Sequence, residues 1–128
     1  MKRLFLAFAL LFLAAVPASA LASVEGRWTN PKRSIIVNVS PCGSAYCGRV
    51  SWASQKAKQK TGDALVGMEL MSGFRPDGNG GYRGRVFEPK HDVRGSATIS
   101  LIGPNSMEVR GCALMGLLCK EQRWTRVR

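Results

Sequence analysis

The strongest structural signal in this sequence is the run Ser34-Ile-Ile-Val-Asn-Val-Ser-Pro-Cys-Gly-Ser-Ala-Tyr-Cys-Gly-Arg-Val-Ser-Trp52. Val, Ile, Tyr and Trp favour the pleated surface of a strand, and alternation places Ile35, Val37 and Val39 on one face. The Pro-Cys-Gly-Ser segment in the middle of the run supplies turn residues. The run therefore predicts a β-hairpin whose tip carries two cysteines.

The four cysteines form two local pairs, Cys42 with Cys47 and Cys112 with Cys119. Four cysteines permit three connectivities, and spacing alone does not choose among them. Each local pair flanks turn-like sequence between strand-like runs, so we expect one disulfide within each pair. A zinc site and a redox-active pair are the alternatives. The spacing of Cys112 and Cys119, however, is wider than that of most zinc ligands, and neither pair has the Cys-x-x-Cys pattern.

The first 22 residues have the layout of a secretory signal peptide. A basic start, Lys2 and Arg3, precedes an apolar run from Leu4 to Val16, and small residues follow. The apolar run is shorter than the roughly 20 residues that span a bilayer. We expect cleavage after residue 20 or 22 and a periplasmic or secreted monomer, which does not span the membrane and has one domain, residues 23–128.

Positive charge is the main feature of the composition. The formal charge of +11 includes Lys2 and Arg3, so the expected product keeps two fewer positive charges, +9. This charge favours anionic partners such as lipid phosphates or anionic envelope polymers. Nucleic acid is disfavoured as a partner. Binding it usually requires exposed aromatic side chains, whereas the strand positions of the tryptophans predict that they are buried.

The rest of the chain alternates between strand-like runs and turns, of which Asp77-Gly-Asn-Gly-Gly81 is the strongest turn signal. Further strands are expected at residues 26–29, 67–74, 82–88, 96–102, 107–113 and about 120–127. Eight short strands are typical of an antiparallel sandwich or an up-and-down barrel. Residues 53–63 are expected to form one short helix or a loop. Candidate contacts for an anion are Lys56, Lys58, Lys60, Arg83 and Arg85.

Five motifs in a fixed order resemble those of a known family: Gly26-Arg27-Trp28, Pro41-Cys42-Gly43, Cys47-Gly48-Arg49-Val50-Ser51-Trp52, Gly84-Arg85-Val86-Phe87-Glu88-Pro89 and Gln122-Arg123-Trp124-Thr125-Arg126-Val127. Together they resemble the bacterial domain of unknown function 2147 family of small exported proteins, over essentially the whole chain after the leader. The resemblance implies a small all-β, antiparallel, eight-stranded barrel of the lipocalin-like, or calycin, kind, and no particular activity. This sequence departs from the common pattern at a basic insert, residues 55–60, and at residues 90–94, where a glycine-containing turn is more usual.

The same resemblance implies a contact that closes one end of the barrel. In calycin barrels an arginine of the last strand lies over the indole of a Gly-x-Trp motif in the first strand. The matching residues are Gly26 and Trp28, and Arg126 is the candidate arginine. A cation over Trp contributes about 0.5–2 kcal/mol. The alternative is that the tryptophans are unrelated core residues and the arginine is solvated.

An eight-stranded barrel has room for its own side chains or for one small ligand. The large side chains that would fill or line this interior are Trp52, Met68, Leu70, Phe74 and Phe87. For so short a chain, we expect filling as the default.

No convincing catalytic set is apparent from the sequence. His91 is next to Asp92 and near Glu88, but adjacent residues on a strand or loop usually point apart. We therefore expect a binding protein rather than an enzyme, with no cofactor and no metal site. The leading hypothesis is a module for a small apolar or amphipathic anionic ligand. The alternatives are a structural or stress-related envelope protein that binds anionic envelope polymers, and a weak hydrolase.

Overall fold

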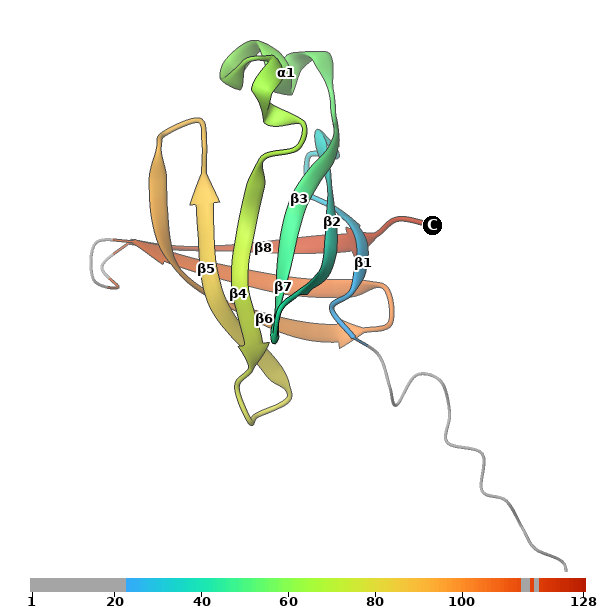
Figure 1. Ribbon diagram of the computed structural model, residues 1–128, viewed down its shortest axis with the longest axis vertical. Helices are drawn as coiled ribbons and strands as arrows, with labels where there is room; N and C mark the ends of the chain where they lie inside the picture. Colours follow the sequence, from blue (N-terminus) through green and yellow to red (C-terminus); the bar gives the residue numbers. More distant parts are fainter. Residues whose placement is uncertain (1–22, 114–115, 117) are drawn as a thin grey trace, which may run out of the picture.

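The computed structural model describes residues 23–113, 116 and 118–128 (Figure 1). The expected signal peptide, residues 1–22, lies outside the described residues. The elements in chain order are β1 (Gly26–Thr29), β2 (Ile35–Cys42), β3 (Ala45–Ala53), α1 (Gln55–Thr61), the 3-10 helix η2 (Asp63–Leu65), β4 (Glu69–Pro76), β5 (Gly81–Glu88), β6 (Val93–Gly103), β7 (Ser106–Ala113) and β8 (Leu118–Arg126). Neither α1 nor η2, the helices of this part of the chain, is long and apolar enough to cross a membrane.

The eight strands form one closed antiparallel barrel. Each strand pairs with the next in sequence, and β8 returns to β1. The seam between β1 and β8 is short, because its registered pairs are Trp28 with Arg126 and Thr29 with Thr125. The barrel expected from the family resemblance is confirmed, and the sandwich is excluded.

The basic segment that follows β3 is a helix. The side chain of Ser54 caps α1 by accepting a hydrogen bond of 3.1 Å from the N–H of Ala57. Lys58 and Lys60 lie in the last turn, where the helix dipole favours positive charge. The N–H of Ser54 also donates to the carbonyl of Ser34, which ties the start of the helix to the β1–β2 loop.

The barrel has two different ends, which we call the open end and the closed end. The open end carries the β1–β2 loop, α1 and η2 between β3 and β4, and the turns that join β5 to β6 and β7 to β8. The closed end carries the turns that join β2 to β3, β4 to β5 and β6 to β7. In Figure 1, α1 lies at the top and the β4–β5 turn at the bottom.

Large side chains fill the interior toward the closed end. The largest side chains that are fully buried are Trp28, Phe74, Ile99, Met107, Val24, Val37 and Val50. The ring of Phe74 fits because Gly84 on the neighbouring strand has no Cβ. A Cβ at that position would collide with the ring. Filling is therefore what this part of the barrel shows, and Phe74 belongs to the core rather than to a ligand surface.

Trp52 is the clearest difference between the expected and the observed interior. Val37 pairs with Val50 and Ile36 with Trp52, so Ser51 is an extra residue in β3 and forms a β-bulge. A bulge reverses the faces of the residues after it. Ala53 is consequently buried, whereas Trp52 is on the outside with 46% of its surface exposed. The prediction that Trp52 lines the interior is wrong, and so is its use as an argument against nucleic acid.

A second bulge lies on β4. Gly48 pairs with Met71 and Arg49 with Glu69, so Leu70 is an additional residue on β4 at this point. Leu70 and Met71 are both buried as a result. Simple alternation assigns Met71 to the outer face, and the bulge overrides that assignment.

Candidate ligand-binding site

The closed end is held by Arg126, as expected. Its guanidinium carbon lies 4.3 Å from the centroid of the Trp28 ring. The guanidinium also donates hydrogen bonds to the carbonyls of Ser23 (2.9 Å), Glu25 (2.7 Å) and Pro104 (2.8 Å). One side chain of the last strand therefore joins the first strand to the β6–β7 turn.

The Gly-x-Trp motif serves this contact in two ways. Gly26 has φ +136°, a conformation that side chains rarely adopt, and a Cβ there would collide with Nη1 of Arg126. Trp28 is fully buried, and its Nε1 donates a 2.8 Å hydrogen bond to the carbonyl of Val24. The motif thus provides a buried ring and a clear approach for the guanidinium.

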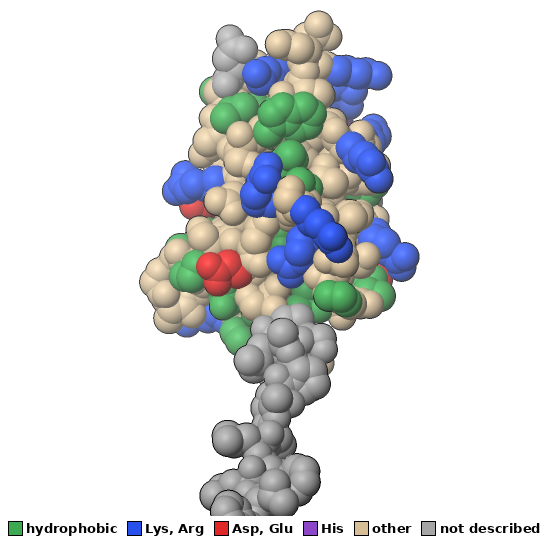
Figure 2. Space-filling view, turned by 90° about the vertical axis from the view of Figure 1, so that its right-hand side faces the viewer, with side chains coloured by type: hydrophobic (Ala, Val, Ile, Leu, Met, Phe, Trp, Pro, Cys, Tyr) green, Lys and Arg blue, Asp and Glu red, His purple; other side chains and the backbone are tan. Residues whose placement is uncertain are grey.

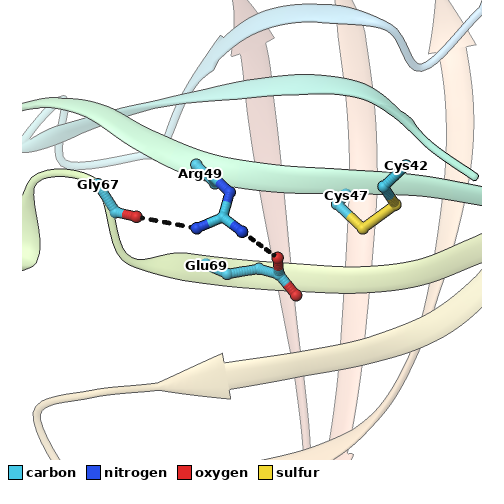
Figure 3. Close-up of polar contacts among 5 residues, drawn as sticks. All are labelled: Cys42, Cys47, Arg49, Gly67 and Glu69. Atoms are coloured by element: carbon cyan, nitrogen blue, oxygen red, sulfur yellow. Dashed lines mark hydrogen bonds and ion pairs between the residues drawn. A yellow bond between two sulfur atoms is a disulfide. The ribbon is translucent and has the colours of Figure 1, made fainter.

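Both predicted disulfides are present, and the described residues leave no cysteine free for a metal. The Cys42–Cys47 bond joins β2 and β3 near their turn at the closed end. Figure 3 shows the bond together with Arg49, which is on the same strand as Cys47 and donates hydrogen bonds to Glu69 and to the carbonyl of Gly67. The Cys112–Cys119 bond joins β7 and β8 at the open end.

The interior becomes hollow toward the open end, because the inward-facing side chains become smaller in that direction. On β6 the series is Ile99, Ala97 and Gly95. On β7 the series is Met107, Val109 and Gly111. The resulting cavity has a volume of about 370 Å³.

The walls of this cavity are mainly apolar. They include Leu70, Met71, Val86, Val109 and Trp124. Its rim is formed by Phe87, Val93, Ala113, Leu118 and the Cys112–Cys119 disulfide, with Glu88, Lys120 and Gln122 as the polar groups. The arrangement suits an apolar body in the cavity and a polar group at the rim.

A second opening lies beside the cavity, between β4 and β5. Their registered pairing begins only at Met71 with Val86, although the strands extend beyond it to Glu69 and Glu88. The gap has a volume of about 400 Å³ and shares Leu70, Val86 and Phe87 with the cavity. The gap and the cavity therefore lie side by side, with these three side chains between them.

Positive charge gathers around the open end. The pKa of Lys60 is lowered from its ordinary value, foremost by the charge of Lys90 and then by that of Lys32, with smaller effects from desolvation and from Lys56. These lysines come from three segments, namely the β1–β2 loop, α1 and the β5–β6 turn. Their mutual repulsion shows that the segments lie close together.

The expected interior residues have different positions in the structure. Leu70 and Phe87 line the cavity, and Met68 lines only the gap between β4 and β5. Phe87 is half-buried, with the guanidinium carbon of Arg94 4.1 Å from its ring centroid. The sequence reasoning missed Gly95 and Gly111, although their places in two tapering series were readable from the alternation.

The five candidate anion contacts do not form one patch. Lys56, Lys58 and Lys60 lie on α1 at the open end. Arg83 lies near the start of β5, toward the closed end, where it pairs with Arg75. Arg85 lines the gap between β4 and β5. The structure therefore separates Arg83 from the three lysines.

His91 pairs with Glu88 and not with its neighbour Asp92. Its Nδ1 lies 3.1 Å from Oε2 of Glu88, and its backbone N–H donates to the same oxygen at 2.6 Å. Both side chains are more than half exposed. The pair therefore orders the β5–β6 turn and has little of the burial that usually tunes a catalytic acid or base.

A closed eight-stranded barrel that is packed at one end and opens into an apolar cavity at the other is a lipocalin-like barrel. Among solved structures, the chain is similar to "Protein HP1028 from the human pathogen Helicobacter pylori belongs to the lipocalin family", with a TM-score of 0.62, 11% identity and 84% of each chain covered. At that identity the likeness shows the fold alone. The comparison with curated proteins finds no match. The family described as "Uncharacterized protein conserved in bacteria (DUF2147)" matches residues 26–126, and the chain belongs to that family.

Proposed function

We propose that this protein is an exported binding protein, and not an enzyme, that takes a small apolar or amphipathic anionic molecule into its open end. The observation that supports this proposal is the 370 Å³ apolar cavity with basic side chains around its opening. The two disulfides fit the oxidising compartment that the proposal requires.

The size of the cavity limits the ligand. Ligand sites usually measure about 300–1,000 Å³, so this cavity is at the lower end. Each buried methylene group contributes about 0.8 kcal/mol to transfer from water, which favours a short apolar chain over a polar body. Lys120 is the basic side chain that lines the cavity itself and is the candidate partner for an anionic head group.

The test compares decanoate, decanol and decyltrimethylammonium by calorimetric titration of the purified protein with both disulfides intact. We expect decanoate to bind more tightly than decanol, and the cationic amphiphile to bind least. Lys120→Gln should weaken decanoate binding about two- to fivefold, the magnitude of an exposed ion pair, and leave decanol unchanged. Equal binding of the three amphiphiles would contradict the assignment of the charged rim.

A second test fills the cavity. Val109→Trp places a large ring in the space, and Val86→Phe is a smaller change on β5, another strand of the wall, in case the first variant folds poorly. Both should abolish decanoate binding, while Ile102→Trp, an exposed residue near the closed end, should bind normally. Decanoate binding that survives in folded cavity-filled variants would refute the site. Native mass spectrometry of protein from its own cell would then show whether a natural ligand copurifies.

A further inference from the structure

Exposed hydrophobic side chains are concentrated at the open end. Among the described residues, five large hydrophobic side chains are exposed, namely Trp52, Val66, Val93, Leu118 and Ile102. Trp52 lies next to the last residue of β3, and Val66 lies between η2 and β4. Val93 and Leu118 begin β6 and β8. Four of the five therefore belong to the open end, and Ile102 belongs to the closed end.

Lysines follow the same distribution. The lysines of residues 23–128 are Lys32 in the β1–β2 loop, Lys56, Lys58 and Lys60 on α1, Lys90 in the β5–β6 turn and Lys120 near the start of β8. All six belong to the open end. The arginines, in contrast, are spread over the walls and both ends. Figure 2, which views the side of the barrel at the right of Figure 1, shows hydrophobic side chains between Lys and Arg side chains.

Acidic residues at the open end offset only part of this charge. Glu69 and Glu121 are already paired with arginines, Arg49 at 3.0 Å and Arg110 at 3.8 Å. Glu88 and Asp92 at the β5–β6 turn and Asp63 at the start of η2 are the acids that reduce the lysine charge at the open end. The six lysines outnumber them, so the open end has a net positive charge.

We infer that the open end is a docking surface for an anionic lipid bilayer. Lysines attract the phosphates of the membrane surface, and exposed Trp side chains favour the boundary between water and lipid. The exposed aliphatic side chains around the rim would enter the same boundary. Docking in this orientation places the cavity opening against the lipid. The inference goes beyond ligand binding and does not depend on it.

The test uses vesicles of phosphatidylcholine alone and of phosphatidylcholine with phosphatidylglycerol, measured by flotation and by tryptophan emission. Trp28 and Trp124 are buried, so Trp52 is the tryptophan that reports contact with lipid. We expect binding to the anionic vesicles only, with a blue shift of the emission. High salt should reverse the binding because it screens the phosphate charge. Absence of binding to the anionic vesicles would overturn the inference.

Matched variants separate docking from nonspecific attraction. Lys60→Gln with Lys90→Gln should weaken vesicle binding about twenty-fivefold, on the basis of about fivefold for each lysine near the surface. Arg75→Gln with Arg83→Gln removes the same charge near the closed end and should have a smaller effect. Equal losses from the two double variants would overturn the proposed orientation.

Trp52→Gln tests the apolar part of the contact. It should abolish the blue shift and weaken binding at least about tenfold, through the lost burial of apolar area. Ile102→Gln, which changes a side chain of nearly equal exposure at the other end, should leave both unchanged.

Two further arms distinguish the lipid surface from other partners. Polyphosphate or single-stranded DNA that displaces the protein from vesicles, with equal affinity for wild type and Trp52→Gln, would assign the surface to an anionic polymer and overturn the inference. Val109→Trp should dock normally while failing to bind decanoate. Failure of the docking surface and failure of the cavity are therefore separate results.

Discussion

Replacing Arg126 by Met should destabilise the barrel more than replacing any other single exposed or half-buried charged side chain. Met keeps most of the apolar stem over Trp28 but removes the guanidinium. The three hydrogen bonds to carbonyls are lost, and each contributes about 1 kcal/mol net. The cation over the Trp28 ring adds about 0.5–2 kcal/mol.

The expected total is about 3 kcal/mol, because the carbonyls lie near the surface and water replaces part of what is lost. For a domain of about a hundred residues this corresponds to a fall in Tm of roughly 12–24 °C. The assay is urea unfolding with both disulfides intact, followed by circular dichroism and by tryptophan fluorescence. The change in tryptophan fluorescence that reports exposure of Trp28 should coincide with the change in circular dichroism that reports loss of the sheet.

Two companion variants make the reasoning refutable. Arg123→Met removes a charge from an exposed position on the same strand and should change stability by less than about 0.5 kcal/mol. Arg126→Lys keeps the charge but lacks the planar fork that reaches three carbonyls, so it should recover no more than about 1 kcal/mol. If Arg126→Met matches Arg123→Met, or if Arg126→Lys is as stable as wild type, the closing role of the guanidinium is refuted.

Three other predictions concern charge and covalent structure. The N–H groups of Asn79 and Gly81 lower the pKa of Asp77 below its ordinary value of 3.8. This stabilisation is present above pH 3.8 and is lost as pH falls through the lowered pKa. Asp77→Asn should therefore be less stable than wild type at pH 7, and the difference should shrink as pH falls below 3.8, measured by urea midpoints. Lys90 lowers the pKa of Lys60 from 10.5. The unfolded chain then binds more protons in the alkaline range, so wild-type stability should rise with pH toward 10.5, and Lys60→Gln should raise the Tm at neutral pH in low salt but not in high salt. Replacing both Cys112 and Cys119 by Ser should cost about 2–2.5 kcal/mol in urea unfolding and weaken decanoate binding, because the bond lies at the rim; unchanged binding would show that the rim is held by other contacts.

Local signals predicted much of the architecture. The hairpin from Ile35 to Ala53, the turn at Asp77 and both disulfides follow from residues that are close in the chain, and the structure has all of them. The contact between Trp28 and Arg126 joins residues far apart in sequence. It was predictable only through the resemblance to a family, since nothing local to either residue indicates the other.

Two bulges explain the errors in the predicted interior. An extra residue at Ser51 turns Trp52 outward, and one at Leu70 brings Met71 inward. Alternation assumes two residues per repeat, so a single insertion reverses every assignment beyond it. Bulges leave a weak local signal in sequence, because the choice of the extra residue depends on the neighbouring strand.

The sequence allowed an interior cavity only as the alternative to a filled barrel, and it did not place that cavity. The sequence identified Leu70 and Phe87, but it gave no reason to separate them from Phe74, which fills the core. The gathering of Lys32, Lys60 and Lys90 depends on how three segments meet at one end of the barrel. The sequence alone does not show that these three segments lie close together, because their proximity depends on the strand order and register.

The short seam between β1 and β8 gives Arg126 a consequence for self-association. If the seam parts, each of its strands becomes an unpaired edge, and such edges can pair with another copy of the chain. The guanidinium joins residues more than a hundred positions apart, so the seam cannot be secured until the last strand is in place. Chains that lack the last strand should therefore aggregate, because the final few residues are needed to close the sheet into a monomeric barrel.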